Sequence, residues 1–209
     1  MIERYTFPER LCHWVTGAFY SYCLATGIAL YTPHLFWIAV VLGGGPASRF
    51  WHPILGVSFA AAALWMHRIW RKDMGFSAAD RDWLNKAGDY ATNHDEAVPP
   101  QDRFNAGQKV FYWVMFYGAW LLLLSGVVMW FPEYVPRGMA WLRGLAILVH
   151  ESAALLTIGA FIVHVYMGVF MVPGSVEAIV NGEVSANWGR SHHRLWFERV
   201  AGKGTAAPR

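Results

Sequence analysis

The chain has 209 residues, of which 56% are hydrophobic and only 15% are charged, and its formal net charge is +3. A soluble domain carries about 25% charged residues, and a disordered chain lacks this much apolar surface, so the composition excludes both classes. The two Cys residues cannot supply a disulfide framework, a zinc site of four Cys or an iron–sulfur cluster. We therefore expect a single all-α membrane domain over residues 1–209, whose nine His residues are the candidates for chemistry.

Four apolar stretches of about 20 residues are long enough to cross a bilayer as helices. The first covers residues 11–30; it contains His13 and lacks a signal-peptide cleavage motif, so we interpret it as a span. Residues 35–42 predict a short interfacial helix, which ends at a Gly-Gly-Gly-Pro run. The second stretch covers residues 53–70 and ends at a charged run.

A polar connection over residues 71–109 follows the second stretch, and a short surface helix is expected within it at 80–89. The third stretch covers residues 110–130 and the fourth covers residues 145–172. The tail at 174–209 predicts an amphipathic helix, a turn and a polar end. Four spans in one short chain predict a four-transmembrane-helix bundle.

The distribution of basic residues predicts the orientation of this bundle. The N-terminal segment, the second-to-third connection together with the adjacent Arg68, and the tail lie on one side and carry two, seven and five Lys or Arg residues, against three on the other side. Because basic segments stay inside, both termini are expected in the cytoplasm. Trp residues near the opposite boundary indicate an aromatic belt: Trp37, Trp51, Trp130 and Trp141.

The fourth stretch contains two His residues, and an ionisable residue inside a membrane marks a functional site. His150 and His164 are 14 residues apart, so on a helix they lie on nearly the same face and about 21 Å apart along the axis. One would lie near the outer surface and the other near the inner surface. This spacing predicts two haems stacked across the membrane, each bound by one His of this helix.

Each haem needs a second ligand at the same depth. His52 begins the second stretch on the outer side, level with His150, and His13 begins the first on the inner side, level with His164. His67 is an alternative partner for His164. Iron bound by two His residues has no open position, so such haems transfer electrons rather than bind oxygen. The remaining His residues are expected to be solvated in loops: His34, His94, His192 and His193.

Several motifs carry a resemblance to a known family. They are Cys12-His13-Trp14, His52-Pro53 with Gly56, Asn105-Ala106-Gly107-Gln108-Lys109, His150, His164-Val165-Tyr166-Met167, and Gly182-Glu183-Val184-Ser185 with Trp188 and His192-His193. With them the chain resembles the cytochrome b-type gamma subunit of membrane-bound respiratory formate dehydrogenase. The resemblance covers nearly the whole chain except the segment before Cys12, the connection at 73–103 and the extreme tail.

This resemblance implies four transmembrane helices and two b haems, with His52 and His150 holding the outer haem and His13 and His164 the inner one. It also implies a quinone site beside the inner haem, with residues Asn105, Gly107 and His164. Asn105 offers a side-chain hydrogen bond, and Gly107 lets a ring approach the backbone. Asn is also a favoured residue for capping the N-terminus of a helix, and both roles are compatible.

The resemblance also implies two partners on the outer face, an iron–sulfur beta subunit and a molybdenum or tungsten alpha subunit. Electrons from these partners would pass through the outer haem and then the inner haem to menaquinone or ubiquinone. This chain would sit in the bacterial inner membrane, would not oxidise formate itself, would assemble as a trimer of heterotrimers and would have no nucleic-acid partner. Two alternatives are a cytochrome b subunit of a nickel–iron hydrogenase or of a thiosulfate- or polysulfide-type reductase, and a haem-free membrane anchor or His-based proton relay.

Overall fold

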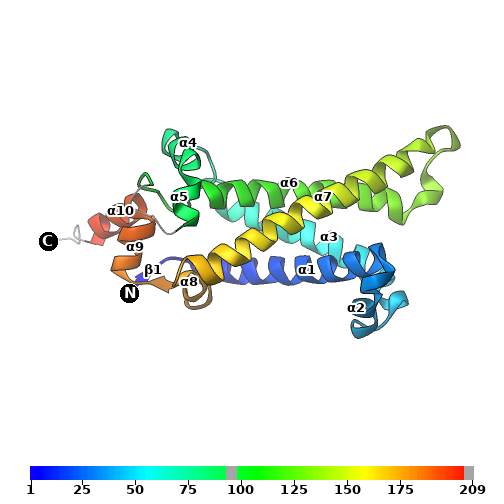
Figure 1. Ribbon diagram of the computed structural model, residues 1–209, viewed down its shortest axis with the longest axis horizontal. Coiled ribbons are helices and arrows are strands. Elements are labelled where there is room, and N and C mark those ends of the chain that lie inside the picture. Colours follow the sequence, from blue (N-terminus) through cyan, green and yellow to red (C-terminus); the bar gives the residue numbers. More distant parts are fainter. Residues whose placement is uncertain (93–97, 205–209) are drawn as a thin grey trace. The chain divides into compact units, whose positions relative to one another are not determined.

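The computed structural model describes residues 1–92 and 98–204. This part of the chain contains four long helices, shown in Figure 1: α1 (Phe7–Tyr31), α3 (Gly45–Trp70), α6 (Ala106–Trp130) and α7 (Trp141–Tyr166). Each has 25 or 26 residues, so each is about 38 Å long, enough to cross a bilayer. A π-helical turn, η5 (Met167–Met171), directly extends α7.

Short elements connect the long helices. They are β1 (Ile2–Glu3), η1 (Pro33–Leu35), α2 (Phe36–Val41), α4 (Ala78–Asn85), α5 (Ala87–Ala91), η3 (Pro132–Tyr134), η4 (Arg137–Met139), α8 (Ser175–Asn181), β2 (Glu183–Val184), α9 (Ala186–His192) and α10 (Arg194–Gly204). The two strands pair antiparallel with Ile2 opposite Val184. The short helix expected at 35–42 is present as α2, and its interfacial position stays a prediction. Helix α3 begins at Gly45, eight residues before the apolar stretch that starts at Pro53.

The chain divides into two compact units, which we describe separately. The helical unit comprises Leu11–Arg68 and Trp113–Ala160, and the terminal unit comprises Met1–Arg10, Ile69–Tyr112 and Phe161–Arg209. All four long helices contribute residues to the helical unit, whereas the terminal unit gathers the N-terminal segment, the polar connection and the tail.

Side-chain contacts hold the long helices together inside the helical unit. Tyr20 of α1 packs on Phe59 of α3, with ring centroids 5.3 Å apart. At Gly118 of α6, an added Cβ would overlap the Thr157 side chain of α7, so these two helices approach as closely as only glycine permits. His67 joins α3 to α6 by stacking on Phe116.

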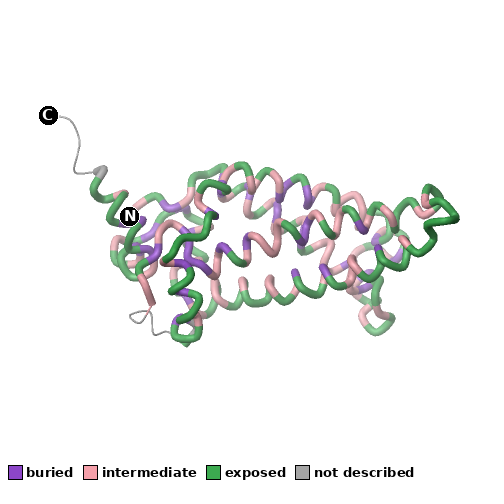
Figure 2. The backbone as a smooth tube through the Cα atoms, turned by 90° about the horizontal axis from the view of Figure 1, so that it is seen from above, coloured by how far each residue is buried: buried purple, intermediate pink, exposed green. Residues whose placement is uncertain are grey.

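Many residues of the long helices are exposed, as the green stretches of Figure 2 show, and many of these exposed residues are large and apolar. On α7 the exposed side chains include Leu148, Leu155, Leu156, Ile162 and Val163. A patch this extensive is unusual for a soluble monomer and suits contact with lipid. Among the described residues, two helices are long and apolar enough to cross a membrane, Ala106–Trp130 and Trp141–Met171. Spans formed by α1 and α3 stay a prediction.

The terminal unit is held by ion pairs that are buried or partly buried. Arg103 donates to Glu9 at 2.6 Å and to Asp73 at 2.9 Å, and Lys109 donates to the buried Asp80 at 2.7 Å. Burial alone would raise the pKa of Glu9, but hydrogen bonds from Thr6 and Trp70 and the charge of Arg103 hold it below its usual value. The pKa of Asp80 is lowered in the same way, against its burial, by Lys109 and Ser77.

The four His residues that were expected to be solvated in loops have different outcomes. His193 was expected in a solvated loop, and this is wrong: it is 2% exposed, and its Nδ1 lies 2.7 Å from the backbone oxygen of Asp102. The tail packs against the polar connection and covers this ring, which a loop assignment from sequence does not reveal. His34 is exposed as expected, His192 is half-buried, and His94 lies outside the described residues.

The surface helix expected at 80–89 is two helices, α4 and α5, separated at Lys86. A capping box begins α4: Ser77 accepts from the Asp80 backbone N–H, and the Asp80 carboxylate accepts from the Ser77 N–H. One face of the pair is buried through Trp83 and Tyr90, whose ring centroids are 5.0 Å apart. This segment is therefore part of the core of the terminal unit.

Candidate functional site

The helical unit brings His52 of α3 and His150 of α7 together. Their ring centroids are 6.2 Å apart with an angle of 58° between the ring planes. The sequence predicted this pair from depth alone, and in the structure the two side chains face one another. Two imidazoles that bind one metal ion from opposite sides, with nitrogens roughly 2 Å from the metal, need centroids about 6 Å apart.

The ring of His52 is oriented by Thr26 of α1. Thr26 Oγ1 lies 2.8 Å from His52 Nδ1, and the same hydroxyl donates its proton to the backbone oxygen of Tyr22 at 2.8 Å. Because the hydroxyl proton is engaged by the helix, Nδ1 of His52 must be the donor and Thr26 the acceptor. This assigns the tautomer protonated on Nδ1, which leaves the Nε2 lone pair available to a metal.

The ring of His150 is oriented in the same way by Ser125 of α6. Ser125 Oγ lies 3.0 Å from His150 Nδ1 and donates to the backbone oxygen of Leu121 at 2.6 Å. The same reasoning leaves Nε2 of His150 unprotonated. Two neighbouring helices thus hold the two candidate ligands in one protonation state.

A glycine follows each of these hydroxyl residues and admits the neighbouring ring. A Cβ added at Gly27 would lie 3.3 Å from His52 Cε1, and one added at Gly126 would lie 3.4 Å from His150 Cε1. Both distances are tighter than ordinary van der Waals contact, so larger residues would push the rings. Thr26, Ser125 and Gly126 were not singled out from the sequence.

These observations test whether the residues fit a haem. Among the described residues, no three His, Cys, Asp or Glu side chains gather in a way that could hold a metal ion. A pair of neutral imidazoles with free Nε2 atoms suits a metal whose other ligands come from its own macrocycle, and two glycines line the pair. His52 and His150 therefore fit a haem with two His ligands.

The other predicted iron ligands fall in different units. His13 lies on α1 in the helical unit, and its ring meets Trp14 edge-on at 5.3 Å. His67, the alternative, also lies in the helical unit and stacks on Phe116 at 4.3 Å. His164 belongs to the terminal unit. The choice between His13 and His67 therefore stays a prediction.

His164 lies in the last turn of α7. Its ring is parallel to that of Phe111 on α6, with 4.2 Å between the centroids and 3° between the planes. The π-helical turn η5 begins three residues later, and there the N–H of Val172 donates to the oxygen of Met167 at 2.9 Å. Such turns occur often at functional sites, because the extra residue redirects neighbouring side chains.

Asn105 caps the N-terminus of α6, which is one of the two roles expected for it. Its Oδ1 accepts from the Gln108 N–H at 2.9 Å, and Gln108 Oε1 accepts from the Asn105 N–H at 3.0 Å. Asn105 Nδ2 is 3.5 Å from the Tyr90 hydroxyl, and the residue is 4% exposed. The capping role is confirmed, while the proposed contact with quinone stays a prediction.

Gly107 faces the edge of the Trp83 indole. A Cβ added at this position would be 3.1 Å from Trp83 Cη2 and 3.4 Å from Cζ3. The sequence predicted that Gly107 lets a ring approach the backbone, and the ring found there belongs to α4. The two predicted quinone residues at the start of α6, Asn105 and Gly107, thus lie beside Tyr90 and Trp83, which come from the polar connection between α3 and α6.

Comparison with known proteins gives matches over most of the chain. A family model described as prokaryotic cytochrome b561 matches residues 4–182. The cytochrome b556(fdo) subunit of formate dehydrogenase from Escherichia coli K12 is 31% identical over 200 residues, which cover 95% of this chain and 93% of the relative.

Two further relatives have similar names. The cytochrome b556(Fdn) subunit of the nitrate-inducible formate dehydrogenase of Escherichia coli K12 is 28% identical, covering 96% of this chain and 92% of the relative. The formate dehydrogenase cytochrome b556 subunit of Haemophilus influenzae is 29% identical, covering 97% and 85%. The family match includes the positions of His13, His52, His150 and His164.

Proposed function

The chain belongs to the prokaryotic cytochrome b561 family, and from this premise we propose that it is the membrane-anchoring di-haem subunit of a respiratory formate dehydrogenase. Its role in that enzyme complex is electron transfer to a quinone, without formate oxidation by this chain. The observation that carries the proposal is the facing pair His52 and His150, with both Nδ1 atoms engaged by hydroxyls.

The outer haem is proposed to bind between His52 and His150. Thr26 and Ser125 fix the two imidazoles as neutral Nε2 ligands, so no proton has to leave either His when iron binds. The adjacent glycines keep side chains away from the rings. The inner haem is proposed to bind His13 and His164. Its support is the resemblance and the sequence depth argument, together with the stacking that fixes the His164 ring on Phe111.

The two haems supply one-electron carriers that link an iron–sulfur donor on the outer face to a quinone on the cytoplasmic side. The quinone is proposed to bind at Asn105, Gly107 and His164. In support of this site, Asn105 has an amide that can donate, and all three residues belong to the terminal unit. The resemblance provides menaquinone and ubiquinone as the candidate substrates.

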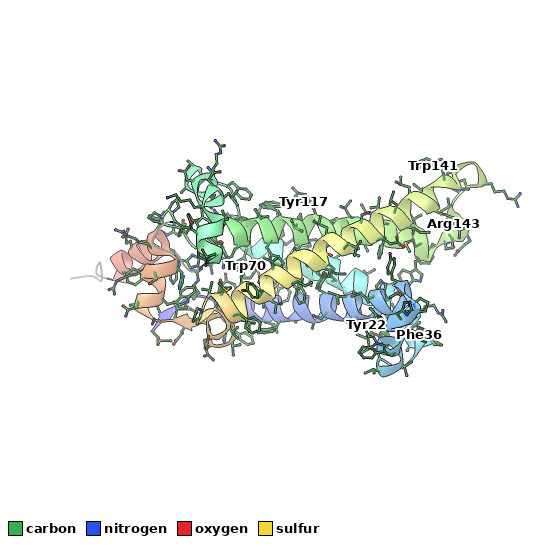
Figure 3. All side chains as sticks on the ribbon, in the orientation of Figure 1. Tyr22, Phe36, Trp70, Tyr117, Trp141 and Arg143 are labelled. Atoms are coloured by element: carbon green, nitrogen blue, oxygen red, sulfur yellow. The ribbon has the colours of Figure 1, made fainter. Side chains whose placement is uncertain are left out.

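In the proposed membrane arrangement, four helices span the bacterial inner membrane and both termini are cytoplasmic. The apolar side chains exposed on α6 and α7 support lipid contact. The four Trp residues of the expected aromatic belt are all exposed: Trp37, Trp51, Trp130 and Trp141. Figure 3 labels Trp141, near the start of α7. The excess of Lys and Arg in the connection and tail supports the orientation.

The proposed partners are an iron–sulfur subunit and a molybdenum or tungsten catalytic subunit on the outer face, in a trimer of heterotrimers. The relatives are named as formate dehydrogenase subunits, which supports the first two partners. The resemblance is the support for the trimer.

The test is purification of the membrane complex through this chain, followed by haem extraction and a reduced-minus-oxidised spectrum. We expect two b haems per chain, reduction of both by formate, and copurification of an iron–sulfur and a molybdenum or tungsten subunit. One haem or none per chain contradicts the di-haem proposal. If formate does not reduce the two haems but hydrogen does, the hydrogenase alternative is supported. If only a sulfur substrate exchanges electrons with the haems, the thiosulfate or polysulfide reductase alternative is supported.

A further inference from the structure

Trp83 has a buried hydrogen-bond donor without an acceptor. The side chain is 5% exposed, and its Nε1–H has no hydrogen-bond partner among the described residues. Buried donors are nearly always paired, because the group loses its hydrogen bonds to water on burial and gains nothing in return. A Phe residue would cover the same surface without this penalty. A bound ligand that accepts a hydrogen bond from this N–H would remove the penalty.

Apolar side chains pack around Trp83. It belongs to a buried cluster with Tyr90, Ala106 and Val172, against which Met167 and Met171 pack. The edge of the indole faces Gly107, where an added Cβ would be 3.1 Å away. A ligand that accepts this hydrogen bond must place its acceptor atom on a flat or apolar group. A quinone head group has this chemistry, because its carbonyl oxygens are attached to a flat ring.

The same cluster adjoins the residues proposed to bind quinone. Gly107 lies four residues, about one helical turn, before Phe111, whose ring stacks on His164. Met167 lies three residues after His164, at the start of the π-helical turn. The cluster that contains Trp83 therefore adjoins both helical segments that carry the proposed site, and all of these residues belong to the terminal unit.

We propose that Trp83 is a quinone-binding residue, whose Nε1–H donates a hydrogen bond to a carbonyl oxygen of the quinone head group. This inference rests on the proposed function, since it assigns a further residue to the same site. Reduction of the quinone takes up two electrons and two protons and converts both carbonyls to hydroxyls. The indole only donates a hydrogen bond and transfers no proton, so the protons come from elsewhere.

The test uses the complete complex with Trp83→Phe, which keeps an aromatic ring and removes the donor. With formate as electron donor, we expect the KM for quinone to rise about tenfold, the effect of losing one hydrogen bond. Formate should still reduce the b haems of this variant in the absence of quinone, at the wild-type haem content.

Trp70→Phe is the matched control. Trp70 is 6% exposed and lies in the same unit, but its Nε1–H already donates to Glu9 at 2.8 Å. This variant should lose thermal stability and keep the wild-type KM for quinone. Trp83→His, which restores a ring N–H, should show a smaller rise in KM than Trp83→Phe at equal haem content, and it provides the test if the Phe variant loses haem.

The failure of this inference can be told apart from the failure of the proposed function. If formate reduces the haems and quinone reoxidises them in the wild-type complex, but Trp83→Phe keeps its KM for quinone, the assignment of Trp83 is overturned and the function stands. An equal rise in KM for the Phe and His variants also overturns it. If formate cannot reduce the haems of the wild-type complex, the proposed function fails and the assignment fails with it.

Discussion

At the residue scale, the clearest feature is the pairing of each candidate ligand with one hydroxyl. Thr26 and Ser125 accept from the Nδ1–H of His52 and His150, and each donates to its own helix. An acceptor on Nδ1 orients the ring and makes the opposite nitrogen a stronger ligand. This arrangement orients both rings for metal binding.

Removal of either hydroxyl is expected to weaken the outer haem site. In Thr26→Val or Ser125→Ala, the affinity for the outer haem should fall about 10–100-fold, the usual effect of losing a hydrogen bond to a metal ligand. The midpoint potential of that haem should rise, because a less basic ligand stabilises the oxidised iron less. Potentiometric titration with haem extraction measures both. Thr26→Ser, which keeps the hydroxyl, is the control, and an unchanged potential in Thr26→Val contradicts the assigned tautomer.

Substitution of the proposed ligands should separate the two haems. His52→Ala and His150→Ala should each remove the outer haem and leave the inner one, whereas His164→Ala should remove the inner haem together with quinone reduction. Optical spectra and the haem content per chain distinguish these outcomes. His13→Ala and His67→Ala form the decisive comparison: loss of the inner haem in His67→Ala, with retention in His13→Ala, would make our assignment wrong.

At the scale of the element, the N-terminus of α6 combines a structural and a proposed binding role. Asn105 and Gln108 satisfy each other's backbone N–H groups, so the helix begins at a fixed residue. The indole of Trp83 then lies on Gly107, within the first turn. The start of this helix is therefore shaped by both its own sequence and α4.

The two roles of Asn105 can be separated by substitution. Asn105→Ala removes the cap and should lower the free energy of unfolding by about 1 kcal/mol, whereas Asn105→Ser keeps a capping oxygen and should remain close to wild type. Both variants lack the amide donor, so both should raise the KM for quinone if Asn105 contacts the substrate. Thermal unfolding and steady-state kinetics with formate check the two effects. A wild-type KM in Asn105→Ser would leave Asn105 with the capping role only.

At the scale of the whole molecule, the terminal unit is assembled from segments far apart in the sequence. Arg103 of the polar connection pairs with Glu9 near the N-terminus and with Asp73 after α3. From the tail, His193 packs beside Asp102 of the same connection. Burial lowers the pKa of His193 well below its usual value, and the charge of Arg4 lowers it further. The ring is therefore neutral in the folded state.

This neutral ring predicts that the terminal unit loses stability in mild acid. The unfolded chain takes up a proton on His193 below a pH of about 6.5, while the folded unit resists it, so stability should fall as the pH drops from 7 toward 5. The carboxylates of Glu9 and Asp80 have lowered pKa values, so their contribution is lost only at a lower pH, below about 4. Hydrogen exchange of tail peptides between pH 7 and 5 measures the effect. The same pH dependence in His193→Gln would contradict this explanation.

The sequence by itself determined the features that depend on neighbouring residues along one helix. Apolar stretches predicted the long helices, and the fixed rise of a helix placed His150 and His164 near opposite surfaces. His52 was then paired with His150 because it begins its own stretch at the same depth, and the two rings do meet. The Asn-Ala-Gly-Gln run predicted the cap of α6, because capping involves residues three apart. Family resemblance supplied the rest of the proposed chemistry.

Only the tertiary structure decided which distant side chains complete these features. Thr26 and Ser125 are recognisable as partners of His52 and His150 only once separate helices pack side by side, since a Ser or Thr in an apolar helix ordinarily bonds to its own backbone. Trp83 over Gly107 and the buried ring of His193 depend on contacts between segments about 24 and 90 residues apart. The sequence determined the composition and spacing that suit a haem-binding membrane protein, and long-range packing decided which residues hold the candidate ligands and cover the proposed quinone site.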